Sequence, residues 1–308
     1  MCGEGSGVEE RPDRRKIVRS WPGALVASQR TISRLLCVMS VAPAHARLLL
    51  ASSLVAVASC GVTPVDWDAE RSMQLSAAHA AHTSLASDGS VIADALADLA
   101  ARVQLPGGAC PGSARLSRAR GKLHAVWWVV RPDSSVRLLA AHSADGGATW
   151  SVAVPVDTTD RGVTGCGREP PAIAADSASG YVHVTYGLMA VQGPGLFFSH
   201  SMDGGAMFHS PVPILFGERL GRTSVAADGD VVAVGFEDPN SRAPRVGLAL
   251  SRTMGHIFEQ RLLPVSNNQG LAVRPLTAVR GRRVTVAWQN SDPRAAGATF
   301  RIITGTLR

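Results

Sequence analysis

The chain has 308 residues, enough for one or two globular domains, and its hydrophobic share of 45% and charged share of 18% are ordinary for a globular protein. Its formal net charge of +7 comes mainly from the first 60 residues, and beyond them the two signs are nearly balanced. The sequence has no arginine cluster with interleaved aromatic residues, so its charge gives no support to nucleic-acid binding.

The first recognisable segment is a short apolar stretch near the N-terminus. Residues 47–60, RLLLASSLVAVASC, are typical of the apolar part of a signal peptide and too short to span a bilayer as a helix. The last four letters resemble the bacterial lipobox, which implies that lipid is attached to Cys60. We therefore expect export to the bacterial cell envelope, with the membrane reached through the lipid anchor only. The alternative is ordinary cleavage at a site of small residues.

The position of this stretch divides the N-terminal region. Met39 opens a short basic segment before it, so we interpret residues 39–60 as a lipoprotein signal peptide. Residues 1–38 are then a non-native extension of the reading frame or a disordered arm. Residues 61–108 are expected to form a tether. Within the tether, apolar residues at helical spacing predict a short helix near residues 90–106, whereas the stretch 101–106 is alternatively a strand that closes the last sheet.

Residues 109–308 change to short alternating strands that recur. Four segments end in an aromatic residue at spacings of 58, 50 and 52, and serines of a second marker recur at 58 and 50. A unit of about 50 residues with four short strands cannot bury both faces of its sheet, so neighbouring units must stack. The sequence thus predicts an all-β fold, a β-propeller of about four four-stranded blades, with the last blade lacking its fourth strand. The four aromatic residues are Trp128, Tyr186, Phe236 and Trp288.

The second marker is a turn motif. The stretches AHSADGGATWS and SHSMDGGAMFH begin at residues 141 and 199, and SRTMGHIF from Ser251 is a third, decayed copy. An Asp followed by two glycines favours a tight turn, with an aromatic residue packed beneath it. The motif resembles the Asp-box, or bacterial neuraminidase repeat, of sialidase-like propellers. That resemblance implies a structural turn between the third and fourth strands of a blade for Ser143, Asp145, Gly147, Trp150, Ser201, Asp203, Gly205 and Phe208.

The opposite face of such a propeller is expected to bind the ligand. Sialidases hold the substrate carboxylate with three arginines, and the resemblance implies this role for Arg168, Arg222 and Arg274, with Asp238 beside them. An arginine matches a carboxylate with two parallel hydrogen bonds. Arg168 lies out of phase with the other two, and the Arg-Ile-Pro motif of the family is absent. The alternative is that all three arginines are solvated loop residues.

Two residues are candidates for catalysis. The resemblance implies a tyrosine and a glutamate as the nucleophile pair, and we assign Tyr186 and Glu237 to these roles. Tyr186 occupies the same place in its unit as Trp128, so a core aromatic is the alternative interpretation.

Two cysteines fall within the repeats. Cys110 and Cys166 each lie just before the first strand of adjacent units, so they form either a disulfide, as expected in an oxidising compartment, or two buried thiols. No metal or nucleotide motif is present in the sequence, and we expect neither a metal nor a cofactor.

The function predicted from these observations is recognition of a glycan or protein ligand at the cell surface by an exported, lipid-anchored propeller. An exo-sialidase-like glycoside hydrolase is the alternative, and a scaffold subunit of an envelope complex is the third.

Overall fold

The computed structural model describes residues 64–76, 79–80, 82–162, 165–266, 270–291 and 298–308. The chain divides into two units, Met1–Val62 and Thr63–Arg308, and the described residues belong to the second. The predicted signal peptide and the lipidation of Cys60 lie outside the described residues. Within the described residues, no helix has the length and apolar character needed to cross a bilayer.

Three four-stranded antiparallel sheets follow one another along the chain, and we call them blades I, II and III. Blade I consists of β5 (Arg115–Ala119), β6 (Lys122–Val130), β7 (Val136–Ser143) and β8 (Val154–Asp157). Blade II consists of β9 (Ala172–Ala175), β10 (Val182–Ala190), β11 (Gly193–Ser201) and β12 (Val212–Phe216). Blade III consists of β13 (Thr223–Asp228), β14 (Val231–Glu237), β15 (Val246–Ser251) and β16 (Gln260–Pro264). The predicted all-β propeller fold with four repeated blades is confirmed by these sheets together with the fourth.

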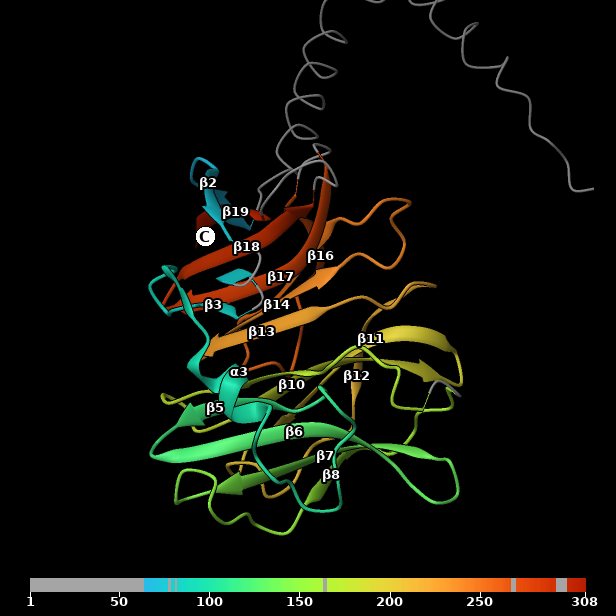
Figure 1. Cartoon of the computed structure of the whole chain (residues 1–308). Coiled ribbons are helices and arrows are strands. Elements are labelled where there is room, and N and C mark those ends of the chain that lie inside the picture. The colour runs from blue at the N-terminus through green and yellow to red at the C-terminus, as the bar shows by residue number, and fades with distance from the viewer. Residues whose placement is uncertain (1–63, 77–78, 81, 163–164, 267–269, 292–297) are drawn as a thin grey trace, which may run out of the picture. The chain divides into compact units, whose positions relative to one another are not determined.

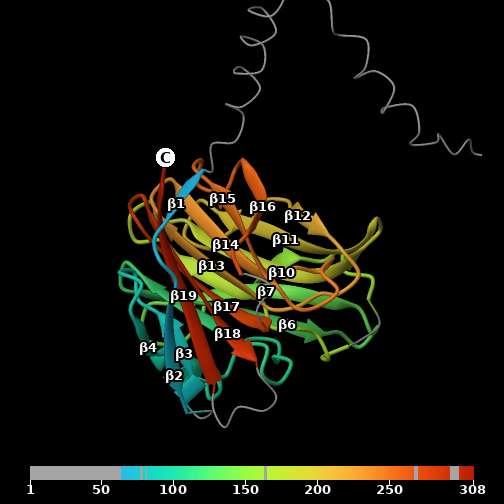
Figure 2. The ribbon, with the colours of Figure 1, turned by 90° about the horizontal axis from the view of Figure 1, so that it is seen from above.

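Blade IV takes its outer strands from the N-terminal side of the chain. Its first three strands are β17 (Leu271–Arg280), β18 (Arg283–Ser291) and β19 (Ala298–Leu307), and β19 pairs antiparallel with both β1 (Val65–Trp67) and β2 (Arg71–Leu75). Figure 2 shows β1 and β2 running beside β19. The closing segment is therefore residues 65–75 and not residues 101–106. Val65 pairs with Leu307 and is 1% exposed, so burial of an apolar residue fixes this pairing.

The segment after β2 fills the space between blades IV and I. It forms the hairpin β3 (Thr83–Leu85) and β4 (Val91–Ala93), followed by the short helix α3 (Ala95–Ala100). The Asp94 side chain caps the helix, because it accepts hydrogen bonds from the N–H groups of Leu96 and Ala97 at 3.0 and 3.2 Å. The hairpin packs on blade IV and the helix on blade I (Figure 1). Helix α3 lies within residues 90–106, for which the sequence left a short helix or a closing strand open.

Apolar clusters join neighbouring blades, and the recurring aromatic residues lie in them. Trp128 and Tyr186 belong to the cluster of blades I and II, Phe236 to that of blades II and III, and Trp288 to that of blades III and IV. All four side chains are buried. Each buried aromatic contributes roughly 2–3 kcal/mol of transfer free energy. The aromatic residues that recur in the sequence are therefore the ones that stabilise the contacts between blades.

The repeated turns lie between the third and fourth strands of blades I, II and III. In the first turn, the Ser143 hydroxyl donates to Asp145 Oδ1 at 2.7 Å and accepts from the Gly147 N–H at 2.8 Å. The second turn has the same bonds at the same distances, made by Ser201, Asp203 and Gly205.

The third turn keeps this pattern with a different side chain. Thr253 stands where the first two turns have Asp, and its hydroxyl accepts from the Ile257 N–H at 2.9 Å, as the carboxylate of Asp203 accepts from the Met207 N–H at 3.0 Å. The carboxylates of these turns are thus engaged with the backbone. Each turn also has an aromatic residue that packs into an apolar cluster of the core; these residues are Trp150, Phe208 and Phe258.

Candidate functional site

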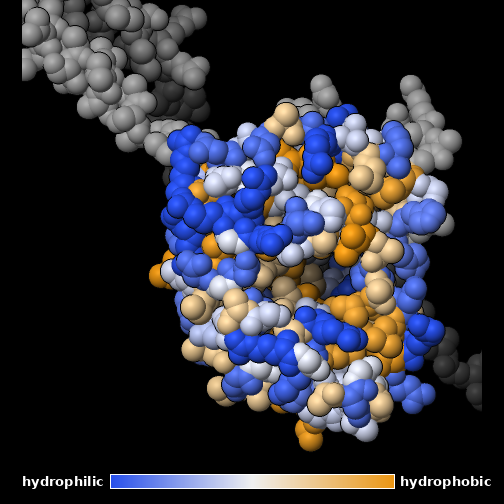
Figure 3. Space-filling model, turned by 90° about the vertical axis from the view of Figure 1, so that its left-hand side faces the viewer, coloured by the Kyte–Doolittle hydropathy of each residue, from blue (hydrophilic) through white to orange (hydrophobic). Residues whose placement is uncertain are grey.

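The first strands of the four blades surround a cavity of about 710 Å³. Its lining residues come from β5, β9, β13 and β17, and the segment from β3 to α3 supplies the remaining side. Most of the lining side chains are small, chiefly alanine, serine and threonine. Figure 3 shows the molecule from the side on which these first strands end, and that face is hollowed near its centre.

Three arginines meet at the other end of the cavity. Arg115 is the first residue of β5, Arg222 directly precedes β13, and Arg274 lies near the start of β17. The arrows of β13 and β17 point the same way in Figure 1, so their first residues lie at one end of the cavity. All three arginines line the cavity, so three guanidinium-bearing residues lie at one end of it.

The electrostatics of these arginines are coupled. Burial lowers the pKa of Arg115, and the positive charge of Arg222 lowers it further, whereas the carboxylates of Asp94 and Glu169 raise it. Burial also lowers the pKa of Arg274, again with a contribution from Arg222. The arginines therefore lie close enough to repel one another in a partly desolvated site. A bound anion would relieve that repulsion.

One ion pair is part of this group. Arg222 Nε lies 3.4 Å from Glu169 Oε2, and both side chains are more than two-fifths exposed. An exposed pair of this kind contributes at most about 1 kcal/mol and exchanges readily. Arg222 is therefore able to turn from Glu169 to an anionic ligand at small cost.

Glu237 lies behind the arginines, at the end of β14. Its Oε1 accepts a hydrogen bond from the backbone N–H of Arg274 at 2.8 Å, and its own backbone N–H donates to the carbonyl of Arg222 at 3.0 Å. Burial raises the pKa of Glu237, an effect opposed by backbone hydrogen bonds from Arg274 and Arg222. The carboxylate is half-buried and does not line the cavity. The structure thus brings Glu237 to the arginines but holds it against their backbone.

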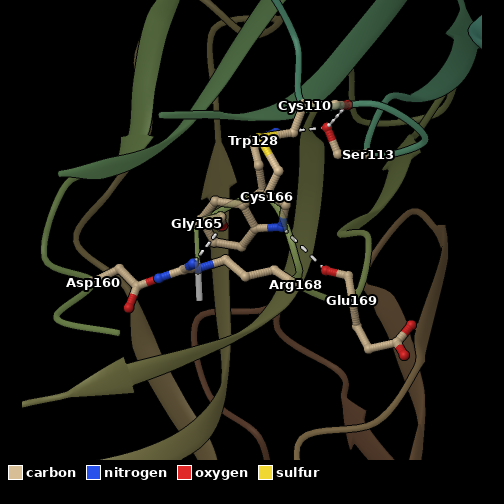
Figure 4. Close-up of a disulfide and its surroundings, with 8 residues drawn as sticks. All are labelled: Cys110, Ser113, Trp128, Asp160, Gly165, Cys166, Arg168 and Glu169. Carbon is tan, nitrogen blue, oxygen red and sulfur yellow. Dashed lines mark hydrogen bonds and ion pairs between the residues drawn. A yellow bond between two sulfur atoms is a disulfide. The ribbon is translucent and has the colours of Figure 1, made fainter. Parts of the chain in front are cut away.

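Arg168 is not brought to the cavity. Its Nε lies 2.5 Å from Asp160 Oδ2 with both side chains buried, 6% and 2% exposed. The same guanidinium donates to the carbonyls of Gly165 at 2.6 Å and Gly162 at 2.8 Å, and it lies 5.8 Å from the ring centroid of Trp128 (Figure 4). These contacts occupy the side chain inside the protein, so the arginine group consists of Arg115, Arg222 and Arg274.

The other two candidates also have local partners. The Tyr186 side chain is fully buried, and its hydroxyl donates to Asp157 Oδ2 at 2.8 Å. Burial raises the pKa of Tyr186 well above its ordinary value. The structure therefore places Tyr186 in the core, the alternative that its phase with Trp128 indicated. Asp238 accepts from the Asn240 N–H at 2.9 Å within a turn after β14, and it does not line the cavity.

Cys110 and Cys166 form a disulfide, separated by 56 positions in the chain. The two residues precede β5 and β9, so the bond ties blade I to blade II. Figure 4 shows the disulfide beside Trp128 and Arg168. In the part of the chain that the structure describes, no group of three or more histidine, cysteine or acidic side chains has a geometry that would hold a metal ion.

Sequence reasoning missed Arg115, although a signal for it was present. Arg222 and Arg274 each precede the aromatic marker of their unit by 14 positions, and Arg115 precedes Trp128 by 13. Arg168 precedes Tyr186 by 18 positions. The spacing to the marker thus separates Arg115, Arg222 and Arg274, at one end of the cavity, from Arg168 in the core.

Comparisons with known proteins give only a likeness of structure. No protein-family model matches the chain, and no curated protein matches its sequence. A solved structure titled Hadza microbial sialidase is similar at 19% identity and a TM-score of 0.42, covering 58% of this chain and 42% of that one. A protein of unknown function from Dyadobacter fermentans has 14% identity and a TM-score of 0.46, with 63% and 52% covered.

The Trypanosoma rangeli sialidase, solved in complex with 2,3-difluorosialic acid, has 11% identity and a TM-score of 0.44. The match covers 77% of this chain and 40% of the sialidase. This chain therefore spans about half of the length of these proteins, or less. Similarity at this level says nothing of activity.

Proposed function

We propose that this protein binds a glycan that carries a carboxylate, at the arginine end of its central cavity. The observation that supports the proposal is the convergence of Arg115, Arg222 and Arg274 at one end of the cavity. A guanidinium offers two parallel donors to a carboxylate, and such charge-assisted bonds are stronger in a partly desolvated site. Three of them around one point suit a single anionic group better than a neutral sugar.

The cavity supports a ligand of limited size. A volume of about 710 Å³ lies within the range of small-molecule sites. Its walls of small residues leave room for one or two sugar rings beside the arginines. A protein partner would reach only the rim of such a hollow, so we favour the glycan over the protein ligand.

Two functions with a glycan ligand are possible, binding alone and hydrolysis, and the structure favours binding alone. Glycoside hydrolysis of the sialidase type needs an accessible nucleophile, and Tyr186 is buried with its hydroxyl bonded to Asp157. The carboxylate of Glu237 is bonded to the backbone of Arg274. Hydrolase activity therefore becomes an outcome of the test below.

We also propose that the protein works outside the cytoplasm. The disulfide between Cys110 and Cys166 supports an oxidising compartment. Together with the apolar stretch of residues 47–60, it favours export, and attachment through Cys60 stays a prediction. The measurement for it is the mass of the mature protein isolated from its host, which would include a lipid on Cys60 if the lipobox interpretation is right.

The ligand is tested by calorimetric titration of the purified protein with 3′-sialyllactose and with lactose. We expect binding of the first only, and we expect Arg115→Ala, Arg222→Ala and Arg274→Ala each to weaken it about 10-fold to 100-fold, because each removes a charge-assisted hydrogen bond. Arg283→Ala is the matched control, since Arg283 is an exposed arginine paired with Asp68.

The outcomes separate the functions. Equal affinity of the wild type and the three cavity variants would refute the proposal, and so would the absence of binding at millimolar sialyllactose. Release of free sialic acid by the wild type, abolished in Arg222→Ala, would replace the binding function with the hydrolase.

A further inference from the structure

Arg274 has a backbone conformation that needs support. Its φ is +55°, in the left-handed region that residues with a side chain rarely adopt. It lies where the pairing of β17 with β18 shifts register, between Val273 and Leu276. An irregularity of this kind redirects a side chain, and it persists only when its surroundings hold it.

The support comes from the neighbouring blade. Glu237, the last residue of β14 in blade III, accepts the hydrogen bond from the Arg274 N–H at 2.8 Å. This N–H belongs to the irregular part of β17, where the regular pairing with β18 is interrupted. The Arg274 side chain reaches Gln289 on β18, with Nη1 3.4 Å from Oε1. Glu237 thus holds the backbone of Arg274, a residue that lines the cavity.

Glu237 also contacts the segment of the second arginine. Its backbone N–H donates to the Arg222 carbonyl at 3.0 Å. Its carboxylate lies against Gly221, where a methyl group would overlap Oε2. One half-buried residue therefore touches the backbone of two of the three arginines, from a position that does not line the cavity.

We propose that Glu237 is a positioning residue that aims Arg222 and Arg274 at one ligand carboxylate. The inference rests on the proposed function of this site and replaces the catalytic role predicted for Glu237 from the sequence. It acts through the backbone of the arginines and not through contact with the ligand.

The sign of the effect separates this role from an electrostatic one. A carboxylate near an anion site repels an anionic ligand, so removing it for electrostatic reasons alone would tighten binding. Removing a residue that positions the arginines would weaken binding, although the net positive charge of the site has increased.

The test compares Glu237→Ala, Glu237→Gln and Gly221→Ala by titration with 3′-sialyllactose. We expect Glu237→Ala to bind about 10-fold more weakly, because the Arg274 N–H loses its acceptor. Glu237→Gln keeps an acceptor oxygen, and its affinity should stay within about threefold of the wild type. Gly221→Ala should weaken binding by displacing the carboxylate, with no further loss when combined with Glu237→Ala.

Glu218→Ala is the matched control, because it removes an exposed carboxylate from the same region of the chain. Thermal unfolding and near-ultraviolet circular dichroism establish that each variant is folded. If Glu237→Ala does not fold, Glu237→Gln and Gly221→Ala still decide the question. Equal or tighter binding by Glu237→Ala, or equal loss in the Ala and Gln variants, would overturn the proposal.

A second measurement needs no ligand. In protein labelled with ¹⁵N-arginine, the amide signal of Arg274 should shift with pH as Glu237 titrates, and this shift should be absent in Glu237→Gln. A wild-type protein that binds no sialoside but shows this shift would refute the proposed function and leave the contact between Glu237 and Arg274 intact. If the chemical shift of the Arg274 amide does not change as Glu237 titrates, the inference itself is overturned.

Discussion

The buried ion pair between Arg168 and Asp160 should be among the most sensitive points of the fold. Asp160→Ala removes the counter-charge of a guanidinium that lies 2.5 Å away and is 6% exposed. It also removes the acceptor of the Gly162 N–H at 2.7 Å and of the Met189 N–H at 3.3 Å. A charge left buried without its partner costs about 3–5 kcal/mol.

That cost is large against the whole stability of the protein. The free energy of unfolding of natural domains is about 5–15 kcal/mol, so Asp160→Ala should remove about a fifth of it or more. The measurement is urea denaturation followed by tryptophan fluorescence, with the disulfide intact. The matched control is Asp68→Ala, whose partner Arg283 lies 3.2 Å away with both side chains about three-fifths exposed. The control should change the free energy of unfolding by less than about 1 kcal/mol.

Two results would refute this reasoning. The first is an Asp160→Ala variant no less stable than Asp68→Ala. The second concerns Arg168→Met, which removes the charge and keeps an apolar side chain beside Trp128. Combined with Asp160→Ala, this substitution should recover part of the lost stability, because no charge then stays buried. A double variant no more stable than Asp160→Ala alone would refute the reasoning. If a folded Arg168→Met protein loses affinity for the sialoside, Arg168 contributes to ligand binding, contrary to its assignment to the core.

Three further outcomes are expected. Burial lowers the pKa of His183 to about 3 and of His200 to about 4, so both stay neutral in the folded state while the unfolded chain takes up protons below about pH 6.5. The free energy of unfolding, measured in urea, should therefore fall between pH 6.5 and 4.5, by up to about 1.4 kcal/mol per pH unit for each histidine. A His183→Leu variant should have a flatter profile, and an unchanged profile would contradict the assignment. Reduction of the disulfide, which spans 56 positions, should lower stability by about 4 kcal/mol, and equal urea midpoints with and without reductant would refute this. Val65→Ala should cost about 2 kcal/mol because Val65 closes blade IV, whereas Val152→Ala, at a position 86% exposed, should cost nothing measurable.

The sequence was sufficient for the repeated parts of this fold. A blade is a local unit, so its signals lie within about 50 residues: an aromatic residue in the second strand and a serine at the turn after the third. Those signals predicted the repeated sheets, and they offered a place in the core only as the alternative to the catalytic role assigned to Tyr186. They also indicated the cysteine pair, because Cys110 and Cys166 hold the same place in adjacent units. The repeated motif also predicted structural turns at Asp145 and Asp203.

The parts that depend on distant contacts could not be predicted in this way. The strand that closes blade IV pairs Val65 with Leu307, at opposite ends of the described chain, and a three-residue strand has no local signal of its own. The spacing to the aromatic marker sets Arg115, Arg222 and Arg274 apart from Arg168, but only the tertiary structure shows that these three line one end of a cavity. Arg115 begins the first strand of blade I and Arg168 shortly precedes that of blade II, but the buried carboxylate of Asp160 holds the side chain of Arg168 in the core. Local patterning therefore determined what each blade is made of, whereas the packing of blades against one another decided which side chains face the cavity, because side-chain direction follows from the partners that each residue meets.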